Sequence, residues 1–225
     1  MKLAILIDPE KISDNTGRLI DMMSVSPPDF VLVGGSTGSA MDALIVRLKE
    51  RVNAPVVLFP GNVSQISGKA DALMFLSLIS GRNPEYLIGS HVKAAPFIKK
   101  MSLKVIPVGY ILIDGGKTSS VQCVSGTNPI DSSDIELITS TALAGQMLGL
   151  SHIYLEAGSG AVHRVPDAVI RAVRDTISIP LIVGGGLRCR ADIDAVASAG
   201  ADIAVIGNAL ESTPEIYTSL FQTPV

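Results

Sequence analysis

The chain has 225 residues, a formal net charge of −3, 47% hydrophobic and only 17% charged residues, which fits one domain with a large core. Its basic residues form no Lys/Arg run, which argues against a nucleic-acid partner, and no apolar stretch is long enough to cross a bilayer. The N-terminus lacks a signal-peptide pattern and the two cysteines, Cys123 and Cys189, lack disulfide or metal-ligand spacing, so we expect a cytoplasmic protein.

Short runs of Val, Ile and Leu recur along the chain, and each is typical of a strand that is buried on both faces. In chain order the predicted strands are Leu3–Ile7, Phe30–Val33, Val56–Phe59, Ala72–Phe75, Lys104–Ile113, His152–Glu156, Leu181–Val183 and Ile203–Ile206. The clearest helical segments between them are Ala40–Arg51, Pro84–Lys100, Asp134–Leu148, Pro166–Thr176, Ala191–Ala199 and Pro214–Phe221.

This alternation of strands and helices predicts a parallel sheet. Eight units in a chain of this length fit a closed (β/α)₈ TIM barrel, a single domain over residues 1–225, better than an open sheet. Between Phe59 and Ala72 the segment Pro60–Gln65 has the composition of a loop. We therefore expect a loop where the third helix of the barrel would stand.

The first two predicted strands end in polar or glycine-rich sequence. The first runs into Asp8-Pro9-Glu10-Lys11, where Asp8 is a candidate Mg²⁺ ligand and Lys11 a candidate phosphate contact. An Asp-Pro turn with a solvated Lys explains the same residues. The second strand ends in Gly34-Gly35-Ser36-Thr37-Gly38, a turn that would lie beside the first strand end at the barrel mouth.

The sixth predicted strand runs into Tyr154-Leu155-Glu156-Ala157-Gly158-Ser159-Gly160. Alternation places Tyr154 and Glu156 on the same face of the strand. If that face is the barrel interior, the Tyr154 phenol and the Glu156 carboxylate lie beside the phosphate site as catalytic candidates, with Glu156 as a general base or a ligand for a substrate hydroxyl. The alternative is an interior Glu that is paired with a Lys or Arg in a structural network.

The last two predicted strands end in Gly184-Gly185-Gly186-Leu187-Arg188 and in Gly207-Asn208, which precedes a helical segment. Glycines let backbone N–H groups approach an anion closely, and a helix N-terminus adds partial positive charge. The loops after strands seven and eight form the usual phosphate site of a barrel. With the turn after the second strand, two anion sites are predicted, and these indicate two phosphorylated groups with the chemistry between them.

With these motifs the chain resembles the geranylgeranylglyceryl phosphate synthases and the related heptaprenylglyceryl phosphate synthases. The segments that carry the resemblance are Leu6–Lys11, Val33–Ser36, Leu87–His91, Gly109–Gly116, Tyr154–Gly160, Val183–Arg188 and Gly207-Asn208, in the family's order over nearly the whole chain. Some members carry Lys two residues before the metal-binding Asp; this chain has Leu6 there, and Lys11 instead, as in another branch.

The resemblance implies a prenyltransferase that joins sn-glycerol 1-phosphate to a polyprenyl diphosphate with Mg²⁺. It implies that Tyr154, Leu155, Glu156, Ala157, Gly158, Ser159, Gly160, Gly185, Gly186, Gly207 and Asn208 hold glycerol 1-phosphate. It also implies that Asp8 and Ser36 hold the metal, and that Glu156 orients or deprotonates the attacking hydroxyl. The prenyl chain is expected in an apolar groove on the side of the missing helix, and a homo-oligomer is expected because the family forms dimers or hexamers.

Three other interpretations fit a phosphate-binding barrel. An isomerase or lyase would use Asp8 and Glu156 as an acid/base pair on opposite strand ends. A flavin-binding barrel shares the glycine-rich phosphate site. A non-catalytic barrel would bind glycerol phosphate without turnover.

Overall fold

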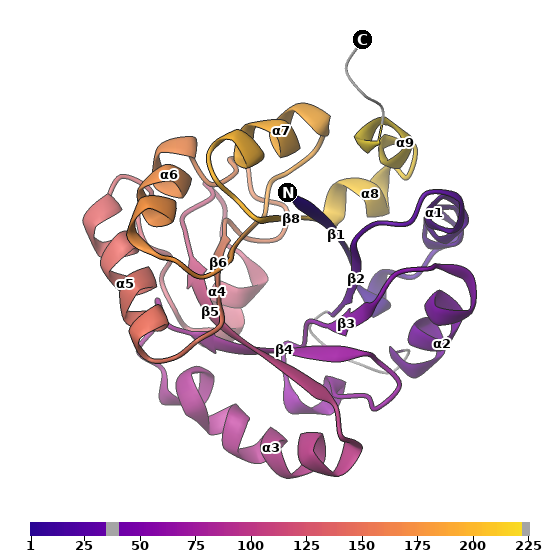
Figure 1. The fold of residues 1–225 in the computed structure, drawn as a ribbon, viewed down its shortest axis with the longest axis horizontal. Helices are drawn as coiled ribbons and strands as arrows, with labels where there is room; N and C mark the ends of the chain where they lie inside the picture. The colour runs from indigo at the N-terminus through magenta and orange to yellow at the C-terminus, as the bar shows by residue number, and fades with distance from the viewer. Residues whose placement is uncertain (35–40, 222–225) are drawn as a thin grey trace.

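The structure is a computed structural model that describes residues 1–34 and 41–221. Eight parallel strands close into a barrel, because β1 pairs with both β2 and β8 (Figure 1). The strands are β1 (Lys2–Ile7), β2 (Phe30–Val33), β3 (Val56–Leu58), β4 (Ala72–Leu78), β5 (Lys104–Leu112), β6 (His152–Glu156), β7 (Leu181–Gly184) and β8 (Ile203–Ile206). The predicted TIM barrel is confirmed, with each strand where an aliphatic run predicts it.

Most of the helices surround the barrel on its outside (Figure 1). They are α1 (Asp14–Val25), α2 (Met41–Arg51), α3 (Ser90–Met101), α4 (Ser120–Ser125), α5 (Ile135–Met147), α6 (Asp167–Thr176), α7 (Arg190–Ser198), α8 (Asn208–Ser212) and α9 (Ile216–Leu220). The connection from β3 to β4 contains only a 3₁₀ turn, Val63–Gln65, so the predicted replacement of the third helix by a loop is confirmed.

Strand alternation separates two apolar layers. Side chains on one face of the strands pack against the helices and form the larger core. Side chains on the other face fill the barrel interior. The fully or largely buried interior residues are Ala4, Leu32, Val57, Ala72, Met74, Leu78, Val108, Tyr110, Leu112, Tyr154, Ile182 and Val205. The prediction that Tyr154 faces inward is confirmed.

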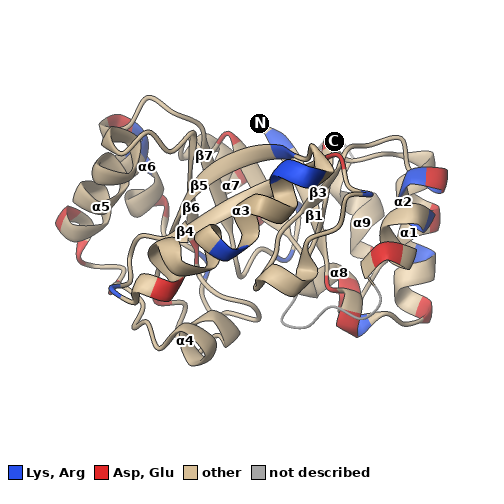
Figure 2. Cartoon of the chain, turned by 90° about the horizontal axis from the view of Figure 1, so that it is seen from below, with Lys and Arg blue, Asp and Glu red and all other residues tan. Residues whose placement is uncertain are grey.

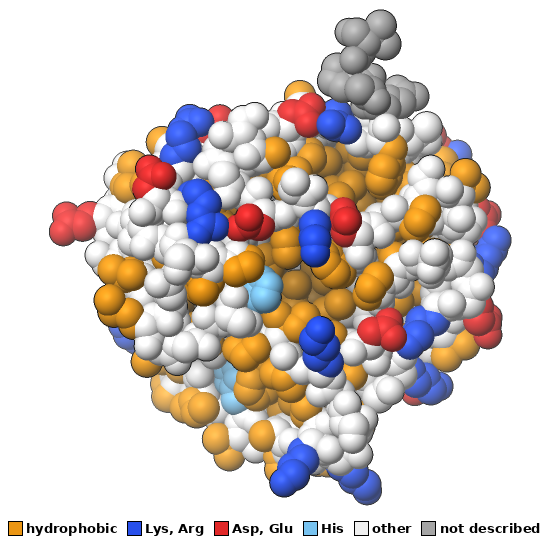
Figure 3. Space-filling model, viewed as in Figure 1, with side chains coloured by type: hydrophobic (Ala, Val, Ile, Leu, Met, Phe, Trp, Pro, Cys, Tyr) orange, Lys and Arg blue, Asp and Glu red, His pale blue; other side chains and the backbone are white. Residues whose placement is uncertain are grey.

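The two ends of the barrel differ in character. Figure 2 shows α4 and α8 at the end opposite the N-terminus of β1. Figure 3 views the N-terminal end, where hydrophobic side chains cover much of the middle. The polar strand ends therefore meet on the far side of that view. Within residues 1–34 and 41–221, no helix combines the length and apolar character that a bilayer crossing requires.

The sequence pattern missed two helices. The buried apolar side chains of α1 are only Leu19, Ile20 and Met23, so the segment shows little helical periodicity. Its start is stabilised by the Ser13 N–H, which donates to Thr16 Oγ1 at 3.1 Å. The six-residue α4 is capped by Ser119, whose hydroxyl accepts from the Gln122 N–H at 3.2 Å. Capping hydrogen bonds, rather than a periodic pattern of apolar residues, define where α1 and α4 begin.

Several predicted boundaries were wrong by a few residues. The fourth strand continues to Leu78 because it pairs with β5 over seven residues. The helix expected from Pro84 starts as a π-helical turn, Glu85–Gly89, and becomes α-helical only at Ser90. Pro166 is the cap of α6 rather than its first residue, and Pro214 lies before α9. Ala40 lies outside the described residues.

The packing of α2 against the barrel predicts a difference between two neighbouring side chains. Ile45 is fully buried in the outer core, whereas Val46 is 38% exposed. Ile45→Ala is expected to lower the free energy of unfolding by about 2–5 kcal/mol, because it leaves a cavity in a close-packed layer. Val46→Ala should cost less than about 1 kcal/mol. Urea unfolding measures both; equal losses would show that α2 does not pack as described.

Candidate active site

One cavity of about 840 Å³ lies at the C-terminal end of the strands. Its polar part is lined by Asp8, Lys11, Glu156, Gly158, Ser159, Gly160, Gly185, Gly186, Arg188, Gly207, Asn208 and Glu211. Its apolar part is lined by Phe59, Val63, Ile66, Leu73, Met74, Phe75, Leu76, Leu78, Tyr86, Ala94, Tyr110, Val121 and Val124. A single space therefore joins the ends of β1, β6, β7 and β8 to the β3–β4 side of the barrel.

Glu156 is the last residue of β6 and is only 6% exposed. Burial raises the pKa of its carboxyl group, while the Tyr154 phenol and the Gly158 N–H, 2.8 Å from Oε1, act in the opposite direction. No Lys or Arg forms an ion pair with Glu156 in the described part of the chain. The carboxylate is therefore suited to accept a proton or a hydrogen bond from a bound hydroxyl.

The Tyr154 side chain is completely buried beside Glu156. Burial raises the pKa of its phenol well above the ordinary value, and the Glu156 charge adds to the shift. The hydroxyl makes no hydrogen bond of ordinary geometry with the described residues. Because a buried hydroxyl without a partner is costly, the arrangement suits a ligand that supplies the missing polar group.

Glycines allow the loops after β6 and β7 to approach this pair closely. Gly158, Gly160, Gly185 and Gly186 have φ values of 99°, 72°, 78° and 73°, which other residues rarely adopt. A Cβ on Gly185 would lie 2.4 Å from Glu156 Oε1, and one on Gly184 would lie 2.2 Å from the Tyr154 hydroxyl. Any side chain at these two positions would displace the carboxylate or the phenol.

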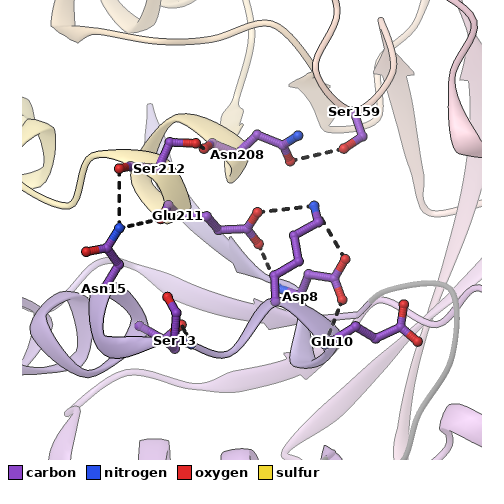
Figure 4. A network of polar contacts seen from close by, with 10 residues as sticks. Asp8, Glu10, Ser13, Asn15, Ser159, Asn208, Glu211 and Ser212 are labelled. Atoms are coloured by element: carbon purple, nitrogen blue, oxygen red, sulfur yellow. Dashed lines mark hydrogen bonds and ion pairs between the residues drawn. The ribbon is translucent and has the colours of Figure 1, made fainter.

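A hydrogen bond joins the loops after β6 and β8 (Figure 4). The Ser159 hydroxyl donates to Asn208 Oδ1 at 3.0 Å, and Asn208 is the first residue of α8. The side chains of Leu155 and Ala157 instead point into the outer core, because strand alternation reverses them relative to Glu156. Neither Leu155 nor Ala157 is among the residues that line the cavity.

The end of β1 is tied to α8 through Glu211 (Figure 4). Glu211 accepts from the Asp8 N–H at 3.0 Å and lies 3.2 Å from Lys11 Nζ, which is 3.5 Å from the Asp8 carboxylate. Burial opposes the charge of Lys11, but Glu211 and then Asp8 outweigh it and raise the Lys11 pKa. Glu211 was not predicted, because a single Glu in a short helix carries no motif.

Two further predictions concern metal binding. Ser36, predicted to share a metal with Asp8, lies outside the described residues. In the part of the chain that the structure describes, no cluster of three His, Cys, Asp or Glu side chains could hold a metal alone. Asp8 caps the turn that follows it, accepting from the Glu10 N–H at 3.0 Å, and faces the cavity.

The missing third helix opens the barrel wall beside β4. The cavity borders Met74 and Leu76 from the inner face of β4 and Phe75 from its outer face. Between β3 and β4 the chain forms only the turn at Val63–Gln65, and His91 of α3 packs edge-on against Phe75 with ring centroids 4.3 Å apart. The apolar part of the cavity therefore extends away from the polar strand ends, as the predicted groove requires.

Comparisons with known proteins show the family of the chain. The PcrB family matches residues 1–223. Geranylgeranylglyceryl phosphate synthase from Flavobacterium johnsoniae is 47% identical over 220 residues, 96% of this chain and 90% of the relative. The synthase from Thermococcus gammatolerans is 40% identical over 94% of this chain and 85% of its own length.

Solved structures show the same similarity. (S)-3-O-geranylgeranylglyceryl phosphate synthase from Thermoplasma acidophilum, solved with its substrate sn-glycerol-1-phosphate, is 38% identical with a TM-score of 0.90. The match spans 97% of the present chain and 90% of the Thermoplasma acidophilum chain. Thiamine phosphate pyrophosphorylase from Pyrococcus furiosus has a TM-score of 0.59 at 10% identity and shares the fold alone.

The buried carboxyl group predicts a change in stability. Since the folded barrel raises the Glu156 pKa, ionisation at neutral pH destabilises the fold, and this loss disappears as pH falls through the folded pKa. Glu156→Gln should therefore have a higher Tm than wild type near about pH 8, with a difference that shrinks toward about pH 5.

Thermal unfolding across this pH range measures the effect. Glu50→Gln, at an exposed position of α2, is the control and should leave the pH dependence of the Tm unchanged. A Glu156→Gln curve parallel to wild type at every pH would contradict the burial of an ionised Glu156.

Proposed function

The chain belongs to the PcrB family, and from this premise we propose that it joins sn-glycerol 1-phosphate to a geranylgeranyl or other polyprenyl diphosphate. The product is an ether-linked glyceryl phosphate, and pyrophosphate is released. The relatives make the chain a transferase of lipid biosynthesis. One observation carries the assignment of substrates: a single cavity has a glycine-rich polar end and an apolar extension.

Glycerol 1-phosphate fits the polar end. The loops at Gly158–Gly160, Gly185-Gly186 and Gly207-Asn208 line it, and their glycines leave the backbone accessible to phosphate oxygens. The Tyr154 hydroxyl, which makes no hydrogen bond of good geometry with the described residues, would meet an oxygen of the substrate. The glycerol would then lie beside Glu156, with the hydroxyl to be alkylated directed toward the apolar part of the cavity.

The diphosphate fits the end of β1. Asp8 and Glu211 supply two carboxylates at the cavity wall, a donor set that suits Mg²⁺ together with substrate phosphates. Asp8, with Ser36, would hold the ion, and Lys11 would contact a phosphate. When bound, Mg²⁺ would neutralise charge on the departing pyrophosphate.

The residues of the chain would assist a substitution at the allylic carbon. The bond between that carbon and the diphosphate oxygen breaks with both electrons leaving on pyrophosphate, and the glycerol hydroxyl oxygen bonds to the carbon. Glu156 orients the hydroxyl and takes its proton, for which its raised pKa is suited. Burial of the site excludes water, which would otherwise capture the allylic group.

No observation favours the other interpretations. The barrels at about one-tenth identity share the fold alone, so they do not support an isomerase or lyase. The relatives at 44–48% identity are named as synthases, which favours neither a flavin-binding nor a non-catalytic barrel. The chain would assemble into a homo-oligomer, since Ile88, Val92 and Phe97 around α3 are 60%, 65% and 55% exposed. Cytoplasmic location stays a prediction.

The proposed reaction predicts a specific product. With labelled sn-glycerol 1-phosphate, geranylgeranyl diphosphate and Mg²⁺, the chain should form an apolar phosphate ether, and sn-glycerol 3-phosphate should react far less. Glu156→Gln should lower turnover by roughly 10²- to 10⁴-fold. Extraction of label into organic solvent measures the product. If no prenyl diphosphate of any length gives product, the proposed function is wrong.

The metal assignment predicts a change in Mg²⁺ dependence. Asp8→Asn removes a ligand charge and should raise the Mg²⁺ concentration for half-maximal activity by at least roughly tenfold, since even outer-sphere partners alter metal affinity by that factor. Asp14→Asn, at the exposed start of α1, should leave the titration unchanged. An Mg²⁺ titration of Asp8→Asn that superimposes on wild type would rule out Asp8 as a ligand.

A further inference from the structure

Aromatic side chains are scarce in this chain but concentrated in its cavity. The sequence has four Tyr, five Phe and no Trp, which is 4% of the residues. Five of these nine line the cavity, namely Phe59, Phe75, Tyr86, Tyr110 and Tyr154. The buried core outside the cavity is mostly Val, Ile, Leu, Met and Ala, with Tyr217 as its one buried ring among the described residues. Because most of the few aromatic rings line this cavity, we ask what they do there.

Three of the rings contact one another. The centroids of Tyr110 and Tyr154 are 5.3 Å apart, those of Phe59 and Tyr154 5.7 Å, and those of Phe59 and Tyr110 6.2 Å. The interplanar angles are 62°, 51° and 49°, so the rings pack edge-to-face or tilted and no pair is stacked in parallel. The three form an aromatic wall of the cavity.

This aromatic wall stands where the polar and apolar parts of the cavity meet. In the barrel register Tyr110 lies between Leu78 of β4 and Tyr154 of β6. Glu156 follows Tyr154 on the same face of β6. The wall thus has an aliphatic surface on one side and the buried carboxylate on the other.

Phe59 is held in this position by its backbone. A Cβ on Gly34 would lie 1.7 Å from the Phe59 carbonyl oxygen and 2.9 Å from the Phe59 Cβ. Glycine at the end of β2 therefore permits the close approach that brings the Phe59 ring to the two tyrosines. The position of the ring depends on a constraint at the strand ends, rather than on loose packing in the open β3–β4 segment.

Resting on the proposed function, we infer that Phe59, Tyr110 and Tyr154 stabilise the positive charge that develops on the allylic carbon as the diphosphate departs. The carbon–oxygen bond breaks, its electron pair leaves with pyrophosphate, and the allylic group becomes electron-deficient next to the rings. The glycerol hydroxyl oxygen then bonds to that carbon and its proton passes to Glu156. The rings would lower the energy of the transition state without forming or breaking a bond themselves.

The chemistry of the rings fits this role. A cation within about 6 Å of a ring centroid is attracted to the negative face of the π system, and the attraction strengthens when water is excluded. Burial, reinforced by the Glu156 charge, raises the pKa of Tyr110 well above its ordinary value, so the ring is a neutral phenol at neutral pH. A Lys at this place would repel the cation, and an aliphatic side chain would leave it unsolvated.

The alternative is that the rings only fill the barrel mouth. Replacing Phe59 with mono-, di- and trifluorinated phenylalanine separates the two roles, because the ring keeps nearly the same shape while its π face loses negative charge. We expect kcat to fall step by step to about 5- to 30-fold below wild type, with KM for both substrates nearly constant. Phe221, which follows α9 and is 41% exposed, carries the same series as a control and should leave kcat unchanged.

A second pair of variants tests the β5 ring. Tyr110→Leu should lower kcat by more than Tyr110→Phe, which keeps the π face and loses only the hydroxyl. Tm and the dissociation constant for glycerol 1-phosphate are measured in parallel to exclude a general loss of structure.

Equal kcat across the Phe59 series would overturn the inference while leaving the prenyltransferase assignment intact. Absence of product from the wild-type chain would instead overturn the proposed function. A fall in kcat that tracks Tm rather than fluorine content would show that the rings act by packing.

Discussion

The Glu156 carboxylate is held inside the barrel at the end of β6, where the Tyr154 phenol and the Gly158 N–H favour its charged form and no Lys or Arg of the described residues pairs with it. Keeping it there constrains its neighbours. Gly184 and Gly185 have no room for a side chain, because a Cβ would collide with the Tyr154 phenol or with the carboxylate. The left-handed loops that follow β6 and β7 depend on this requirement, and they create the open backbone at the polar end of the cavity. The close packing of these glycines against Tyr154 and Glu156 therefore accounts for both the anion site and the buried base.

The second constraint is the absence of a helix between β3 and β4. Elsewhere the outer faces of the strands are covered and serve stability. Beside β4 the cavity instead reaches residues of both faces, so an apolar chain can lie next to a polar headgroup site. A prenyl transfer needs such a junction, since its two substrates differ in polarity and must meet at one carbon. The aromatic wall and Glu156 stand at the junction, while Asp8, Lys11 and Glu211 lie on the side where the diphosphate would bind.

The sequence predicted the strands because parallel strands buried on both faces leave uninterrupted aliphatic runs, and it predicted the glycine loops because tight strand ends require glycine. It also placed Tyr154 and Glu156 together, since a period of two is unambiguous. It missed α1 and α4, whose starts depend on single capping contacts. Glu211, Phe59 and Tyr110 were missed because their importance arises from contacts across distant strands. Leu155 and Ala157 were included from a contiguous motif, although alternation turns their side chains into the outer core.

The central claim is that one cavity holds both substrates across the Glu156 carboxylate. A crystal structure of the chain with sn-glycerol 1-phosphate and an unreactive thio-analogue of geranylgeranyl diphosphate tests it most directly. We predict the glycerol phosphate at Gly158–Gly160, Gly185 and Asn208, its reacting hydroxyl at Glu156, and the prenyl chain along β4 beside the 3₁₀ turn. A prenyl chain bound outside the barrel mouth, or a glycerol phosphate on a different set of strand ends, would contradict the account.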